Sequence, residues 1–237
     1  MERKEFIKKG FSALGLAVVS PIFIRCDDSD DDPTQEVVSG GDGSCEVTPS
    51  ETEGPFPTKN PTSLERVDIR SDREGIEMAI NITILNGNND CAVLKEAYVD
   101  IWHCDRDGNY SEYGGTGMQM TDYTSAHFLR GRQQTDVSGL VTFTSIFPGW
   151  YASRAPHIHV HIYDASGKSL LVTQIAFPEE LCNTVYTTAT QYYTKGTQDT
   201  SNERDNVFGD GYDLELATVT GNITDGFVLT HSIVVNA

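Results

Sequence analysis

The chain has 237 residues, with 17 Lys and Arg against 35 Asp and Glu, and its formal net charge at pH 7 is −18. Binding to nucleic-acid phosphates requires clustered basic side chains, so this composition excludes a nucleic-acid partner. A hydrophobic content of 38% is ordinary for a globular protein, and the length allows one domain with a substantial core.

Residues 1–26 have the layout of an export leader. Basic residues crowd the first nine positions, and an apolar stretch follows from residue 11 to residue 24. That order is typical of a signal peptide. The stretch is about 14 residues long, whereas a helix that crosses a bilayer needs roughly 20. We therefore expect export and not a permanent transmembrane anchor.

Cys26 closes the apolar stretch and resembles a lipoprotein acylation site, so a lipid anchor at Cys26 and plain removal of the leader both stay open. Residues 27–43 are rich in Asp, Ser and Gly and are too polar to bury a core, which predicts a disordered acidic tether. Its Asp-rich start resembles the tethers of surface lipoproteins in some Gram-negative bacteria. We expect an exported protein, in the periplasm or at the outer membrane and surface as a lipoprotein of such a bacterium.

Four further cysteines follow the tether, an even number in a chain that we expect to be exported. One or two disulfides are therefore predicted. Four cysteines allow three complete pairings, and spacing alone does not choose among them. No pair has the C-x-x-C spacing of zinc sites. The four are Cys45, Cys91, Cys104 and Cys182.

Residues 44–237 are predicted to form an all-β protein with a single β-sandwich domain. Between residues 76 and 84, apolar side chains alternate with mostly polar ones, which is the period of a half-buried strand. No amphipathic helix of 12 residues competes with the strands. Long loops, which usually carry function or disorder, are expected at 110–132 and 179–211. The further strands are expected at 97–103, 139–146, 157–163, 170–177, 214–220 and 227–235.

His157 and His159 stand two residues apart on an expected strand, so their imidazoles project to the same face. Two such nitrogens can hold one metal ion. The alternative is a pair of polar side chains on an exposed strand face. No Glu or Asp within the strand completes the ligand set of an iron(II) oxygenase. Tyrosines are available instead, and a phenol with a pKa near 10 ligates at neutral pH only beside a highly charged cation such as Fe(III).

Three ordered blocks of sequence resemble the intradiol ring-cleavage dioxygenases, a family that includes protocatechuate 3,4-dioxygenase and catechol 1,2-dioxygenase. The likeness starts near residue 48 and runs to the strand that ends at residue 177. Several ordered blocks are more specific than any single motif. The blocks are 99–105 with Gly108 and Tyr110, 128–139, and 147–159.

The resemblance implies a non-haem Fe(III) centre, one ion per chain, and a β-sandwich of the intradiol dioxygenase type. Its substrates would be a small aromatic diol and O2, and its product a cis,cis-muconate-type diacid. By position, Tyr110, Tyr151, His157 and His159 match the metal ligands, and Tyr110 would also accept a substrate proton. Two other residues match catalytic positions, namely Arg154, which would steady negative charge on the substrate, and Gln174, which would line the pocket.

Two other functions are compatible with parts of this pattern. A non-catalytic exported β-sandwich of the same ancestry would bind a glycan or a protein, although it would have no need of the four ligand positions with Arg154 and Gln174. A hydrolase could hold zinc at the two histidines, but tyrosinates are unusual zinc ligands. Phe56 stands where relatives often carry Tyr, which leaves the preferred ring substituents undecided.

Overall fold

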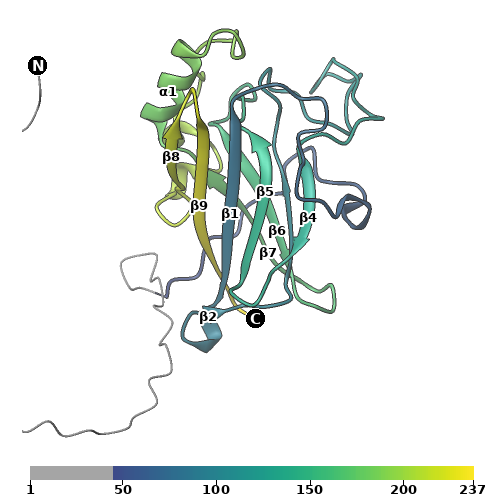
Figure 1. Cartoon of the computed structure of the whole chain (residues 1–237), viewed down its shortest axis with the longest axis vertical. Coiled ribbons are helices and arrows are strands. Elements are labelled where there is room, and N and C mark those ends of the chain that lie inside the picture. Colours follow the sequence, from purple (N-terminus) through teal and green to yellow (C-terminus); the bar gives the residue numbers. More distant parts are fainter. Residues whose placement is uncertain (1–44) are drawn as a thin grey trace, which may run out of the picture. The chain divides into compact units, whose positions relative to one another are not determined.

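The computed structural model describes residues 45–237. The expected leader, the expected tether and the lipid anchor at Cys26 lie outside the described residues. Two β-sheets face each other across a shared hydrophobic core (Figure 1). The prediction of an all-β sandwich is confirmed, because nine strands make up these sheets and the described residues contain a single α-helix.

The first sheet is built around β1 (Glu77–Asn86), the strand that residues 76–84 predicted. It pairs antiparallel with β5 (Leu140–Ile146) and, on its other side, parallel with β9 (Gly226–Val235). β8 (Thr218–Asn222) continues the sheet beyond β9, and the short β2 (Ala92–Val93) pairs with the far end of β1.

The second sheet is antiparallel throughout and has the order β4, β3, β6, β7. These strands are β4 (Arg130–Gln134), β3 (Tyr98–Trp102), β6 (His157–Tyr163) and β7 (Ser169–Ala176). Trp102 faces His159 across the β3–β6 pair, and His159 faces Gln174 across the β6–β7 pair. The register therefore places candidate site residues from neighbouring strands side by side.

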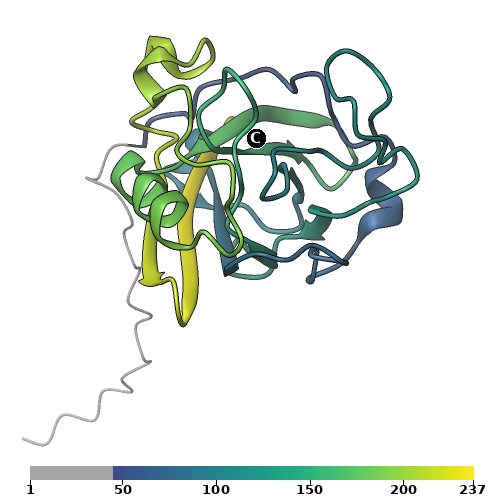
Figure 2. The same cartoon turned by 90° about the horizontal axis from the view of Figure 1, so that it is seen from above.

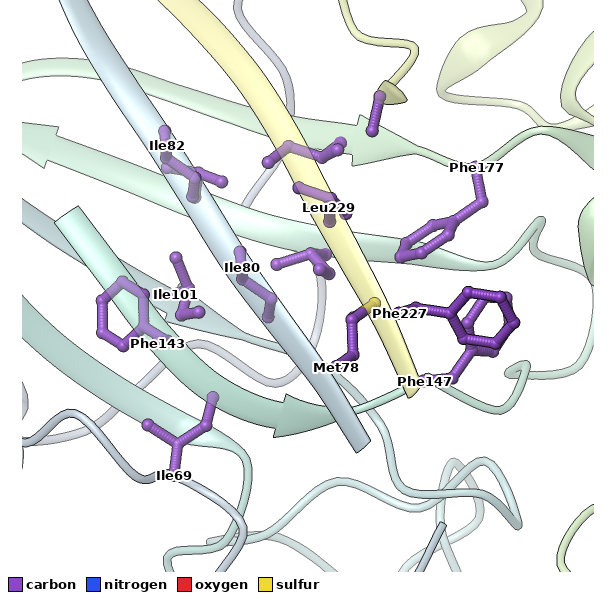
Figure 3. Close-up of a cluster of buried hydrophobic side chains, with 14 of the residues drawn as sticks. Ile69, Met78, Ile80, Ile82, Ile101, Phe143, Phe147, Phe177, Phe227 and Leu229 are labelled. Atoms are coloured by element: carbon purple, nitrogen blue, oxygen red, sulfur yellow. The ribbon is translucent and has the colours of Figure 1, made fainter. Parts of the chain in front are cut away.

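The core lies between the sheets and follows directly from the alternation in β1. Met78, Ile80, Ile82 and Ile84 are all 0% exposed. Figure 3 shows Met78, Ile80 and Ile82 in the cluster that also contains Ile101 of the opposite sheet. Burying an aliphatic side chain of this size contributes about 1.5–3 kcal/mol, so this one strand anchors the sandwich.

Three elements were absent from the sequence prediction, and one of them is the two-residue strand β2, which is too short to show a pattern. The segment 179–211, expected to be a loop, begins with helix α1 (Glu179–Thr188) and continues through two short 3-10 turns, Asn202–Arg204 and Phe208–Asp210. Acidic residues in the first turn of α1 complement the helix dipole. Strand β4 was also missed, because it contains Arg130 and Arg132 and lacks the apolar alternation of a strand.

Among residues 45–237, no helix is long and apolar enough to cross a membrane. One disulfide, Cys45–Cys91, joins the start of the described chain to the turn after β1. Cys104 and Cys182 are free and buried. Of the pairings that the sequence left open, the structure contains this one alone among the described cysteines.

Residues 48–58 form a segment that we call the N-terminal strap, which runs along the outer side of the second sheet. Figure 2 shows this purple part of the chain passing outside the green strands. Glu51 N–H donates to the Val172 carbonyl of β7, at 2.8 Å. Further along, Phe56 is buried. The strap thereby covers the face to which the odd-numbered residues of β6 point.

Candidate functional site

The two histidines of β6 lie side by side on the outer face of the second sheet, as predicted. Their Nε2 atoms are 3.1 Å apart, and both side chains are buried under the strap. The strap backbone lies directly against His159 at Gly54, where a Cβ would lie 3.2 Å from Cε1 of His159. The ring of Trp102 stacks on His159 with an interplanar angle of 3°, which fixes the plane of that imidazole.

The geometry defines the protonation of His157. Its Nδ1 lies 2.6 Å from the Ala155 carbonyl oxygen. Because a carbonyl can only accept, Nδ1 carries the proton and Nε2 presents a lone pair. Burial, followed by the nearby Arg154 charge, lowers the pKa of His157 to about 3. Burial and then His157 lower the pKa of His159 well below its ordinary value. Both imidazoles are therefore neutral, the state in which histidine binds metal.

Tyr110 reaches the histidine pair from a loop outside both sheets. Its hydroxyl lies 3.1 Å from Nε2 of His157. The ring is 2% exposed and stacks on Phe56 of the strap, with ring centroids 4.8 Å apart. Burial raises the pKa of Tyr110 well above its ordinary value, so this phenol ionises only if a cation stands beside it.

Tyr151 lies close by but does not join the cluster through its hydroxyl. Its ring centroid is 6.1 Å from that of Tyr110. Its hydroxyl donates instead to the Met118 carbonyl, at 2.8 Å. The structure therefore brings Tyr110, His157 and His159 within hydrogen-bonding distance, and it places the fourth expected ligand beside them with its oxygen turned to a neighbouring loop.

Two glycines allow the tyrosine-bearing loops to pack backbone against backbone. A Cβ at Gly149 would lie 2.4 Å from the Arg106 carbonyl oxygen, and one at Gly108 would lie 2.4 Å from that of Trp150. Real Cβ atoms do not approach backbone so closely. Gly108 also has a φ of +89°, which favours glycine. Both loops depend on these positions to bring Tyr110 and Tyr151 together.

Arg154 and Gln174, the two catalytic positions that the resemblance implied, contact each other beside the histidine strand. The Arg154 guanidinium donates to Oε1 of Gln174 at 2.7 Å, and the Gln174 amide donates to the Thr52 carbonyl of the strap at 2.8 Å. The Arg154 Nε lies 2.8 Å from the nearer carboxylate oxygen of Asp205, whose side chain is 0% exposed. The same carboxylate accepts the Ala155 N–H at 2.6 Å.

Sequence reasoning missed two polar residues that hold the site, Asp205 and Gln119. Asp205 lies in the 179–211 segment, whose length was the one signal that pointed to function. Gln119 lies in the 110–132 segment and is 5% exposed. Neither residue belongs to a motif, so the sequence offered no reason to select it within its loop.

The donor atoms fit a single metal ion. Two ligand atoms at right angles, each about 2.1 Å from a metal, lie about 3 Å apart, which matches both the nitrogen–nitrogen and the oxygen–nitrogen spacing here. Within the described part of the chain, no three His, Cys, Asp or Glu side chains cluster as a metal site. The donor set therefore combines imidazole nitrogen with phenol oxygen, and a phenolate requires a hard, highly charged cation.

Comparison with known proteins adds independent information. A family model described as "Dioxygenase" matches residues 53–217. Catechol 1,2-dioxygenase 1 of Acinetobacter lwoffii is 25% identical over 179 residues, which cover 67% of this chain and 52% of that protein. The chain thus spans about half the length of this curated relative.

Solved structures show the same fold. The intradiol ring-cleavage dioxygenase from Tetranychus urticae superposes with a TM-score of 0.72 at 28% identity, over 81% of this chain and 95% of that chain. The dioxygenase domain of a dioxygenase carbohydrate-binding protein fusion from Streptomyces sp. SirexAA-E superposes with a TM-score of 0.58 at 24% identity, over 81% of this chain and 99% of that one. The second likeness concerns the fold alone.

Proposed function

We propose, from the premise that this chain belongs to the intradiol ring-cleavage dioxygenase family, that it opens catechol-type aromatic diols at one Fe(III) ion per chain. Both atoms of O2 would enter the ring, and the product would be a cis,cis-muconate-type diacid. The observation that carries the proposal is the convergence of three donor atoms, the Tyr110 hydroxyl oxygen and the Nε2 atoms of His157 and His159.

The residues that would hold the ion are Tyr110, Tyr151, His157 and His159. Bound Fe(III) would supply a Lewis acid that accepts the diol oxygens and renders the ring reactive toward O2. To contribute its oxygen, Tyr151 must release the Met118 carbonyl and turn toward the histidines. The Tyr110 oxygen would serve as the proton acceptor for the bound diol, since a phenolate regains its high proton affinity when it leaves a cation.

Arg154 and Gln174 would position the substrate. Asp205 already neutralises the charge of Arg154, so the guanidinium acts as a hydrogen-bond donor held in a fixed direction. A donor of this kind stabilises negative charge that develops on the diol and on the ring. Gln174 links Arg154 to the strap and thereby restricts the orientation of that donor.

We further propose that the protein works outside the cytoplasm. The Cys45–Cys91 disulfide supports this, because disulfides persist mainly in oxidising compartments. Substrates would then be extracellular aromatics, such as those released from plants. Fractionation of the source cells tests the location, and recovery of the protein in the cytosol would contradict it.

Loading with iron tests the metal centre. Protein that holds Fe(III) at these residues will be coloured by tyrosinate-to-iron charge transfer, and Tyr110→Phe will shift or weaken that band. Lys168→Met, on an exposed turn, serves as the control and leaves the band unchanged. A colourless protein with full iron occupancy would contradict the ligand assignment.

Oxygen uptake with a panel of catechol, protocatechuate, hydroxyquinol and substituted catechols tests the reaction. We expect at least one diol to be consumed with one O2 per ring, and Arg154→Met to lower kcat far more than the bound iron content. If iron is held while no diol is consumed, the non-catalytic binding module becomes the better account.

A further inference from the structure

The loop of residues 113–121 passes beside the candidate site and is fastened by one buried side chain. Gln119 is 5% exposed, whereas its neighbours Met118 and Met120 are 57% and 77% exposed. The backbone of Gln119 also pairs with Thr116 in both directions, at 3.1 and 3.2 Å. A polar side chain buried between two exposed methionines is the reverse of what the hydrophobic effect alone would produce.

The Gln119 amide is occupied by the backbone of the site loop. Its Oε1 accepts the Tyr110 N–H at 2.6 Å, and its Nε2 donates to the Tyr110 carbonyl at 2.8 Å. This side chain therefore gives Tyr110 the pair of hydrogen bonds that a facing strand residue would provide. Nε2 also donates to the carbonyls of Tyr113, at 2.9 Å, and Thr121, at 3.2 Å, which closes the loop on itself.

The adjacent residue contacts the other tyrosine. The Met118 carbonyl accepts the Tyr151 hydroxyl at 2.8 Å. Two consecutive residues of one loop thus hold both candidate tyrosines, Tyr110 through its backbone and Tyr151 through its hydroxyl. Tyr110 has no strand partner, and among the described residues Gln119 makes the recorded hydrogen bonds to both its N–H and its carbonyl.

We propose that Gln119 is a positioning residue of the metal site: its amide sets where the Tyr110 oxygen stands relative to His157, and its loop carries the carbonyl that Tyr151 must leave to reach the metal. This inference rests on the proposed function, because it takes both tyrosines to be ligands. Removing the amide would leave a buried N–H and a buried carbonyl of Tyr110 without partners, and the ligand would drift from the histidines.

Gln119→Met tests the inference, because it keeps the length of the side chain and removes its hydrogen bonds. Gln134→Met is the matched control, since Gln134 is exposed and its amide makes a single bond, to the Glu96 carbonyl at 3.1 Å. Two measurements are made on each variant and on the wild type. One is hydrogen exchange of the Tyr110 amide in metal-free protein, and the other is the absorption band of the Fe(III)-loaded protein.

In Gln119→Met we expect the Tyr110 amide to exchange roughly tenfold faster, because about one hydrogen bond is lost. We also expect the ferric absorption band to shift or weaken. Gln134→Met should change neither. A ferric band that keeps its wavelength and intensity in Gln119→Met would overturn the inference even if exchange rises, because the residue would then stabilise the loop without positioning the ligand. A wild-type protein that binds no iron would instead overturn the proposed function.

Gln119→Glu covers the case in which the methionine variant does not fold. A protonated carboxylic acid can donate as the amide does, whereas a carboxylate would face three carbonyl oxygens. Relative to the wild type at the same pH, Tyr110 exchange in this variant should be near normal at acidic pH and roughly tenfold faster at pH 8. The ferric band of the Fe(III)-loaded variant should likewise shift or weaken at pH 8. Exchange that stays normal at both pH values, or a ferric band that is unchanged at pH 8, would overturn the inference.

Discussion

The Arg154–Asp205 pair shows how one residue secures another at the candidate site. The side chain of Asp205 is 0% exposed, and it accepts hydrogen bonds from both Arg154 and the Ala155 N–H. Loss of one partner of a buried pair leaves the other charge uncompensated, which costs about 3–5 kcal/mol. We therefore predict that Asp205→Asn lowers the free energy of unfolding by about 3 kcal/mol in urea denaturation.

The control for this variant is Asp68→Asn, which breaks the exposed Arg70–Asp68 pair. Exposed ion pairs contribute about 0–1 kcal/mol, so a small change is expected there. If Asp205→Asn were no more destabilising than Asp68→Asn, the anchoring role of Asp205 would be wrong.

His231 provides a test of acid stability away from the site. It is buried on β9, its Nε2 has no hydrogen-bond partner among the described residues, and burial lowers its pKa to about 4. Below pH 6.5 His231 is protonated in the unfolded chain but stays neutral in the folded chain. The free energy of unfolding therefore decreases as pH falls, and the decrease levels off near pH 4. Between pH 7 and pH 5 the protonation of this residue lowers the free energy of unfolding by about 2 kcal/mol.

We predict that His231→Leu reduces the acid sensitivity of unfolding by that amount, measured as the difference between urea unfolding free energies at pH 7 and pH 5. The other buried histidines keep titrating, so some sensitivity remains in the variant. Equal pH dependence in both proteins would show that His231 is protonated without cost in the folded state.

At the scale of elements, the contact between the two tyrosine loops depends on Gly149. A methyl group there would meet the carbonyl oxygens of Arg106 and Asp105 at 2.4 and 2.5 Å. Gly149→Ala should therefore separate the loops, lower the unfolding free energy by about 1–3 kcal/mol and weaken iron retention. Gly117→Ala is the control, because a Cβ at Gly117 has nothing within 4 Å. Equal stability of the two variants would contradict the close approach.

The elements that sequence reasoning found are those whose burial is regular. β6 was predicted with its observed bounds, and β1 within two residues at either end, since alternate residues of these strands enter the core. β4 was missed because Arg130 and Arg132 point outward to buried polar partners, which no period reveals. α1 was missed because it is only 10 residues long and buries only three of them, Cys182, Val185 and Tyr186.

The same reasoning explains what could be predicted of the candidate site. The spacing of His157 and His159 fixes their common face, since a strand has one geometry. The direction of the Tyr151 hydroxyl depends on a carbonyl 33 residues away in sequence, at Met118. Contacts of this kind arise from how loops fold against each other, and local sequence pattern contains no record of them.

At the scale of the whole molecule, the disulfide closes a long stretch of chain, because its two cysteines are 46 positions apart in sequence. In the chain-entropy account such a closure stabilises the fold by about 4 kcal/mol. We predict that Cys45→Ser lowers the urea midpoint accordingly, while iron retention of the folded protein stays the same, because the bridge lies beyond the far end of β1. Loss of iron from the folded variant would contradict this separation.

The position of that bridge has a mechanical consequence. Tension applied to the chain ahead of Cys45 would pass through the sulfur atoms into the turn after β1. The contacts of Thr52 with Gln174 and of Phe56 with Tyr110 lie beyond that link along the chain and would be shielded from this load. A pulling force on the amino end would therefore leave the N-terminal strap in place over the histidine pair for as long as the disulfide is intact.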